Sequence, residues 1–145
     1  MKISTKGKYG LRIMTDLAVY GKDGCVSIKD IAARENLSEK YLEQIINLLS
    51  KHNLVKSIRG AKGGYLLTQE PEVITVEQIL IATEGSLAPS ACVENSDCCE
   101  NYCDCVTSFI WAKMYEAVND VVQHITLDDL AKRKLVNINK SEQEI

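Results

Sequence analysis

The chain has 145 residues, of which 46% are hydrophobic and 26% charged, a composition typical of one globular domain of ordinary size. No apolar run approaches the roughly 20 residues needed to span a bilayer, and the N-terminus lacks the apolar segment of a secretion signal. We therefore expect a cytoplasmic protein, whose thiols stay reduced. Its six cysteines then favour metal or redox chemistry over a disulfide framework.

Charge is distributed unevenly along the chain. Residues 1–65 carry 12 Lys and Arg against 6 Asp and Glu, a net of +6, whereas residues 66–145 carry 5 against 14, a net of -9. A basic half attracts polyanions, because each phosphate contact releases condensed counterions. The asymmetry predicts a nucleic-acid-binding front and an acidic sensing or assembly part, although an inert surface with uneven charge would have the same composition.

Apolar residues at helical spacing predict three helices in the first third of the chain. They cover about 5–21, 27–36 and 38–51, and Ser or Thr residues stand at their starts. The tight Asn36–Leu37 turn between the last two predicts a helix-turn-helix. The polar face of the third helix carries side chains of the kinds that reach base edges and phosphates: Lys40, Tyr41, Gln44, Asn47 and Lys51.

A β-hairpin is predicted next, with strands at 54–59 and 65–67 and a glycine-rich turn at 60–64. Arg59 and Lys62 stand at its tip. A hairpin with a basic tip directly after a helix-turn-helix indicates a winged helix. The glycines do not form the pattern of a nucleotide-binding loop.

The C-terminal half is predicted to be helical on both sides of a cysteine-rich stretch. Thr75 and Gln78 form a capping box for a helix that ends near Gly85. A longer helix at 106–125 carries an apolar stripe at a period near 3.5 residues, formed by Trp111, Tyr115, Val118, Val122 and Ile125. That period suits a partner helix and predicts dimerisation, while packing on its own domain is the alternative.

The end of the chain is expected to be simpler. Thr126 and Asp129 cap a short helix at 127–132, and residues 134–145 are expected to be a loose polar tail. Cys25 stands alone between two predicted helices, and we expect it to be a small core residue.

Five of the six cysteines lie in the fourteen residues from Cys92 to Cys105. This stretch has only acidic charge and no apolar periodicity, so packing alone cannot order it. It holds no CxxC pair, which disfavours a zinc ribbon. An iron-sulfur cluster, zinc or thiol-disulfide sensing, and inert cysteines all remain open from the spacing, and thiolates suit cluster iron.

Five segments together resemble one family, the winged-helix transcription regulators that include IscR, NsrR and CymR. They are MKISTKGKYGLRIMTDLA, LSEKYLEQIINLL, SIRGAKGGYLL, CVTSFIWAKM and ITLDDLA. The resemblance implies a mainly α fold with a small β-wing: a winged helix-turn-helix DNA-binding domain plus a long dimerisation helix. It also implies a homodimer that binds a partly palindromic double-stranded DNA operator.

The resemblance also implies where DNA is bound. LSEKYLEQ would be the recognition helix and SIRGAKGGY the wing, with Arg59 in the minor groove. Two lysines would add basic charge, and two glycines would shape the wing. The expected DNA-binding residues are Ser38, Lys40, Tyr41, Glu43, Gln44, Arg59, Gly60, Lys62 and Gly64.

The cysteines distinguish branches of this family. IscR-like members hold a 2Fe–2S cluster with three cysteines and a histidine, NsrR-like members hold a 4Fe–4S cluster with three cysteines and an acidic residue, and CymR-like members lack the cysteines and respond to an enzyme of cysteine synthesis. The spacing here is most similar to the IscR-like branch, which implies Cys92, Cys98 and Cys105 as metal ligands and favours 2Fe–2S, with 4Fe–4S as the alternative.

The fourth ligand does not follow from the resemblance. Ser108 stands at the histidine position and Lys8 at the acidic position. Cys99, Cys103 or a residue of the partner chain would then complete the site, and Cys99 also competes with Cys98 as the second ligand.

These observations predict a DNA-binding transcription regulator and not an enzyme. Residues 1–85 would bind DNA, 86–105 hold the cluster, 106–133 dimerise and 134–145 form the tail. The cluster would control operator binding and so repress or activate genes of iron-sulfur assembly or cysteine metabolism. The alternatives are a cluster-free sensor of cysteine or thiol status, acting with a cysteine-synthesis enzyme, and an iron-sulfur electron carrier.

Overall fold

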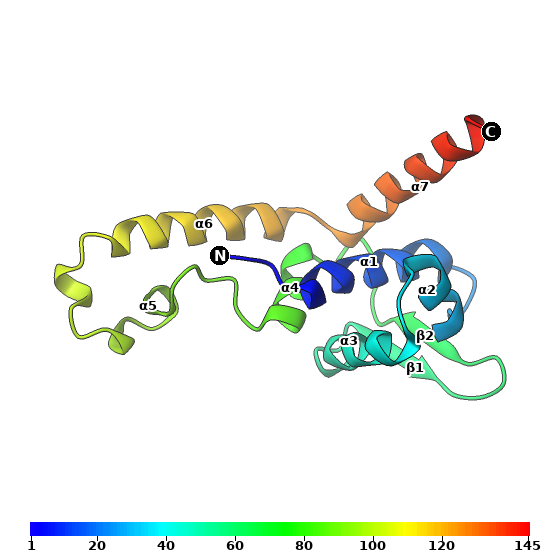
Figure 1. Ribbon diagram of the computed structural model, residues 1–145, viewed down its shortest axis with the longest axis horizontal. Helices are drawn as coiled ribbons and strands as arrows, with labels where there is room; N and C mark the ends of the chain where they lie inside the picture. Colours follow the sequence, from blue (N-terminus) through cyan, green and yellow to red (C-terminus); the bar gives the residue numbers. More distant parts are fainter.

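The computed structural model describes residues 1–145 as an elongated molecule (Figure 1). A body at one side holds the N-terminal helices and the hairpin, and α6 carries the cysteine stretch away from it. The helices are α1 (Thr5–Tyr20), α2 (Ile28–Glu35), α3 (Glu39–Lys51), α4 (Val76–Glu84), α5 (Ala91–Glu94), α6 (Ser108–His124) and α7 (Leu127–Gln143), and the strands are β1 (Val55–Ile58) and β2 (Gly64–Leu67). No helix has the length and apolar character needed to cross a membrane.

The body forms around one core of 17 buried residues. Ile13, Met14 and Leu17 supply the α1 face, and the predicted apolar side of α3 faces them. The expected caps form, since the Ser27 and Ser38 hydroxyls accept from the first-turn amides of α2 and α3. Helix-turn-helix geometry follows, because Asn36 caps the end of α2 in the left-handed conformation and α3 begins three residues later, at Glu39.

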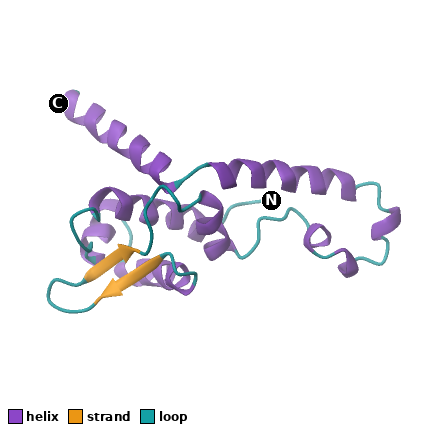
Figure 2. Cartoon of the chain, turned by 180° about the vertical axis from the view of Figure 1, so that it is seen from behind, coloured by secondary structure: helices purple, strands orange, loops and turns teal.

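The wing is a two-stranded antiparallel hairpin that pairs Val55 with Leu67 and Ile58 with Gly64. Figure 2 shows it at one end of the molecule, with the cysteine stretch at the other. Its base is attached to the body by two backbone hydrogen bonds between Val26 and Tyr65, at 3.0 and 2.8 Å. A Cβ on Gly64 would collide with the Val26 carbonyl, so this attachment requires glycine.

Helix α6 packs on α4 through a second, smaller core. Val122 is buried there with Val76 and Leu80, and Tyr115 and Val118 pack against the same cluster. Tyr115, Val118, Val122 and Ile125 of the apolar stripe therefore pack on their own domain, whereas Trp111 lies outside this cluster and is half-buried. A period near 3.5 residues is close to the 3.6-residue period of any buried α-helical face. The period alone therefore did not distinguish packing on a partner helix from packing on the chain's own domain.

Helix α7 corrects the expectation of a short helix followed by a loose tail. It continues through Lys134 to Gln143, and the capping box at Thr126 and Asp129 is present. Leu127 and Ala131 are buried on α1, and Lys134 makes ion pairs with acids of α1 and α2. These distant contacts hold the segment in the helix beyond the predicted end.

Candidate DNA-binding surface and cysteine loop

The exposed face of α3 lies at the surface next to the wing. Lys40, Glu43 and Gln44 are exposed on it. The Ser38 hydroxyl accepts a hydrogen bond from the Tyr41 amide at 3.2 Å, so Ser38 acts first as the helix cap. The Tyr41 ring is half-buried and packs edge-on against Tyr9, with ring centroids 6.0 Å apart. Among the residues of this segment that are expected to bind DNA, Lys40, Glu43 and Gln44 therefore have the side chains that are most accessible to a ligand.

The wing tip presents exposed basic side chains on a constrained turn. Arg59 and Lys62 are both exposed, and Gly60 adopts a φ of +116°, which a residue with a side chain rarely adopts. Burial, with a smaller contribution from the Glu43 carboxylate, raises the pKa of Tyr65 at the wing base. Helix α3 contacts β1, so the exposed face of the helix and the wing are neighbours.

Cys25 contacts the wing and is not a core residue. Its side chain is half-buried, and its thiol donates a hydrogen bond to the Lys62 carbonyl at 3.0 Å. The loop before α2 thereby contacts the wing tip. The expectation of a small buried cysteine failed because the sequence does not show that the wing folds back over this loop.

A network of ions at the base of the helix-turn-helix was not foreseen from the sequence. Asp16 is completely buried, and Arg34 donates to both of its oxygens at 2.8 Å. Glu35 is nearly buried and binds Arg12 at 2.6 Å, while Lys134 reaches both acids. The hydrogen bond from Arg34 to Asp16 raises the pKa of the guanidinium. The network joins α1, α2 and α7.

The cysteine stretch forms short helical turns at 91–94, 96–98 and 102–104, joined by extended residues. All five thiols are free, with Cys98 and Cys103 exposed and the other three half-buried. The structure does not gather three or more possible ligands into one metal site. The donor chemistry suits iron, but Cys92, Cys98 and Cys105 are not brought together here.

Cys105 lies directly before α6. A hydrogen bond from the Thr107 hydroxyl, with smaller contributions from the following backbone amides, lowers the pKa of its thiol. The thiolate, which is the form that binds metal, is favoured at this position. Ser108 donates its hydroxyl to the Cys105 carbonyl at 2.7 Å, so its side chain serves the start of α6.

A helix-turn-helix followed by an attached basic wing defines a winged-helix DNA-binding transcription regulator. The chain belongs to the Rrf2 family, described as iron-dependent transcriptional regulators, whose family model matches residues 3–133. This is a family of regulators and not of enzymes.

Named relatives come from more than one branch. The chain is 44% identical over 131 residues to the HTH-type transcriptional regulator CymR of Bacillus subtilis, covering 90% of each chain. It is 34% identical over 136 residues to the HTH-type transcriptional regulator IscR of Pectobacterium atrosepticum, covering 94% of this chain and 82% of the relative.

Solved structures confirm the fold. The structure described as CymR, the global cysteine regulator of B. subtilis, superposes with a TM-score of 0.77 at 44% identity, covering 92% of this chain and 98% of the other. The T. potens IscR structure has a TM-score of 0.74 at 43% identity, covering 92% and 88%. The mainly α fold with a two-stranded wing is therefore confirmed.

Proposed function

We propose that the protein is a homodimer that reads a DNA operator with α3 and the wing, and whose DNA affinity is controlled by an iron-sulfur cluster on the cysteine loop. Lys40, Glu43 and Gln44 would face the major groove, and Arg59 and Lys62 the adjacent backbone or minor groove. Ser38, Tyr41, Gly60 and Gly64 would position those residues through the helix cap, the packing on Tyr9 and the shape of the wing.

The exposed, basic helix and wing carry the DNA-binding part of the proposal. The first 65 residues have a net charge of +6, and α3 contacts β1 of the wing. Phosphate contacts supply most of the affinity of such a surface, and base contacts supply its specificity.

Dimerisation is supported by apolar side chains of α6 that its own domain leaves uncovered. Ile110, Met114 and Val121 are 46%, 37% and 56% exposed, and they lie along one face next to the stripe buried on α4. Phe109, at the start of the helix, is 67% exposed. A second copy that covers this face would place two recognition helices at a fixed separation, as an operator with two half-sites requires.

Replacing Ile110 with glutamate is expected to dissociate the dimer. The two-fold axis places the new charge in the interface twice, and a cost of about 3 kcal/mol would weaken association about a hundredfold. Sedimentation equilibrium measures the dissociation constant. Lys113→Glu introduces the same side chain on the same helix at an exposed position and is the control. A dimer of unchanged affinity in Ile110→Glu would show that the interface lies elsewhere.

The cluster part of the proposal is supported by five thiols within fourteen residues directly before α6. Thiolates of Cys92, Cys98 and Cys105 would bind iron, with 2Fe–2S favoured and 4Fe–4S as the alternative, and Cys99 or Cys103 is available as a further ligand. Closing these exposed turns around a cluster would fix the start of α6. Because α6 carries the proposed dimer face, the loop is placed to alter the separation of the two recognition helices.

Removing a cysteine that is a proposed cluster ligand is expected to abolish the cluster, whereas removing a cysteine outside the loop is expected to preserve it. Alanine at Cys92, Cys98 or Cys105 should leave iron and sulfide near zero after anaerobic purification, because each would remove a cluster bond. Cys25→Ala, which removes a thiol that lies at the wing, is the matched control and should retain both. Iron, sulfide and the visible spectrum give the readout. Full occupancy in all three loop variants would refute the ligand assignment.

A cluster-free regulator of cysteine metabolism is the second candidate. Two observations favour it: the 44% identity to a protein described as a global cysteine regulator, and loop thiols that are not gathered into a site. Wild-type protein purified anaerobically without iron or sulfide, yet able to bind its operator tightly, would select this candidate over the first.

A further inference from the structure

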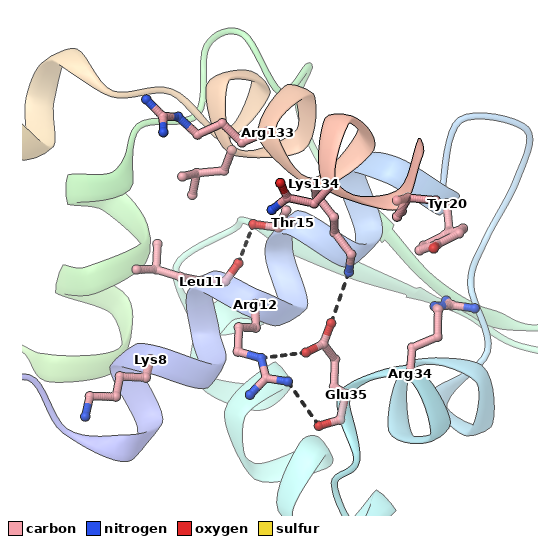
Figure 3. A pocket seen from close by; sticks show the side chains of 12 residues that line it. Lys8, Leu11, Arg12, Thr15, Tyr20, Arg34, Glu35, Arg133 and Lys134 are labelled. Carbon is pink, nitrogen blue, oxygen red and sulfur yellow. Dashed lines mark hydrogen bonds and ion pairs between the residues drawn. The ribbon is translucent and has the colours of Figure 1, made fainter. Parts of the chain in front are cut away.

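A cavity of about 750 Å³ lies between α1, α2 and α7, away from the DNA-binding surface and the cysteine loop. Figure 3 shows it from close by. Its volume is within the range of about 300–1,000 Å³ that is usual for small-molecule sites. None of the proposed DNA contacts and none of the cysteines lies in its lining.

The inner wall of the cavity is the ion network at the end of α2. Glu35 Oε2 lies 2.6 Å from Arg12 Nε, and Glu35 Oε1 lies 3.1 Å from Lys134 Nζ. Asp16 lies beneath and is bound by Arg34 and Lys134. Both carboxylates are therefore paired with cations, which offset their repulsion of an incoming anion.

Positive charge at the cavity exceeds what these two acids neutralise. Five cationic side chains line it, at positions 8, 12, 34, 133 and 134, against Glu35 in the lining and Asp16 below, an excess of +3. Lys8 and Arg133 are exposed and form no ion pair in the structure. Figure 3 shows Lys8 at one end of the cavity and Arg133 at the other, with Leu11 between them.

The remaining lining is apolar apart from Thr15 and Asn137. Leu11 of α1 and Leu130 and Ile138 of α7 contribute aliphatic side chains. Tyr20 lies further along, where its ring contacts the Arg34 guanidinium at 4.0 Å. An apolar floor flanked by unpaired cations at its mouth complements a molecule with an apolar body and a negatively charged group.

We propose that the cavity between α1, α2 and α7 is a binding site for a small organic anion, a carboxylate or phosphate ester with an apolar body. The molecule lies along the apolar surface of Leu11, Leu130 and Ile138, with Lys8 at one end of the cavity and Arg133 at the other, and both cations attract its negative charge. Such a ligand touches Arg12 and Lys134, which hold Glu35 at the end of α2. The site does not depend on the proposed function, because binding is measured without DNA.

The test uses the full-length protein and the fluorescent anion 8-anilinonaphthalene-1-sulfonate. We expect saturable binding that Lys8→Glu and Arg133→Glu each weaken by about tenfold or more, since each converts an attraction into a repulsion. Lys140→Glu makes the same change of charge on α7, at an exposed residue outside the cavity, and should leave the affinity within about twofold. All three replaced residues are exposed, so folding should be preserved.

Displacement of the bound probe identifies the chemical group that the site takes. Phenyl phosphate or phenylacetate should displace it, and the stronger of the two names the preferred charged group, whereas neutral benzyl alcohol should not. The proposal is overturned if the wild type shows no saturable binding, if the three variants bind alike, or if benzyl alcohol displaces the probe as well as the anions do.

Discussion

Replacing Arg59 with alanine is expected to weaken operator binding by about ten- to a hundredfold, equivalent to about 1–3 kcal/mol. Arg59 is exposed at the tip of a wing that Gly60 shapes and that two hydrogen bonds to Val26 hold in place. A constrained turn therefore holds the side chain at the surface, and the proposed DNA contact would need little reorganisation. Fluorescence anisotropy with a duplex selected from a random pool by the wild-type protein gives the affinity.

The conservative variant Arg59→Lys separates charge from geometry. Lysine retains the phosphate attraction but not the planar, forked group, so it should recover most of the salt dependence and less of the sequence discrimination. A wild-type affinity and salt slope in Arg59→Ala would show that the wing does not contact DNA.

Replacing Asp16 with alanine is expected to lower the free energy of unfolding by about 3 kcal/mol. The carboxylate is completely buried and accepts from Arg34 and Lys134, so its loss leaves two cations facing one another beside Glu35. Those cations retain partial contact with water, at 30% and 25% side-chain exposure, which places the estimate at the low end for a broken buried pair. Urea denaturation followed by circular dichroism measures the change.

Lys113→Ala provides the matched control for Asp16. It breaks the exposed pair of Lys113 with Glu116, whose side chains are 57% and 65% exposed, and should change stability by less than about 1 kcal/mol. Equal effects of the two variants would mean that the buried network contributes no more than a surface pair.

Features set by neighbouring residues were predicted well from the sequence. The caps at Ser27 and Ser38 and the capping box at Thr75 form as expected, because each depends on residues within one helical turn. The hairpin was also predicted, with strands one or two residues different from those observed, since its glycines and basic residues mark the turn. Most of the proposed DNA-binding surface follows from these local rules.

Features that depend on distant contacts were not predictable in this way. Lys134 lies 118 positions after Asp16 in the chain, and their ion pair helps hold α7 beyond the predicted end. The stripe of Tyr115, Val118 and Val122 has a period that fits both a partner helix and its own domain. Val122 is buried against α4, whereas the neighbouring Ile110 is 46% exposed and belongs to the face that we propose for a partner.

The cysteine loop was predictable only in part. Sequence spacing nominates Cys92, Cys98 and Cys105, but the loop has too little apolar surface to fold into a fixed arrangement by packing. Local rules therefore describe its short turns and the hydrogen bond of Cys105 with Thr107, but they do not determine the mutual placement of its thiols.

The most direct test of the central claim compares one protein preparation in two states. Full-length protein is purified without oxygen, its iron and sulfide are measured, and its affinity for the selected duplex is determined before and after the cluster is removed by chelation. Cluster control predicts stoichiometric iron and sulfide and dissociation constants that differ by about tenfold or more, a coupling of about 1.4 kcal/mol. Equal affinities for every selected duplex, or protein that never holds iron and sulfide, would contradict it.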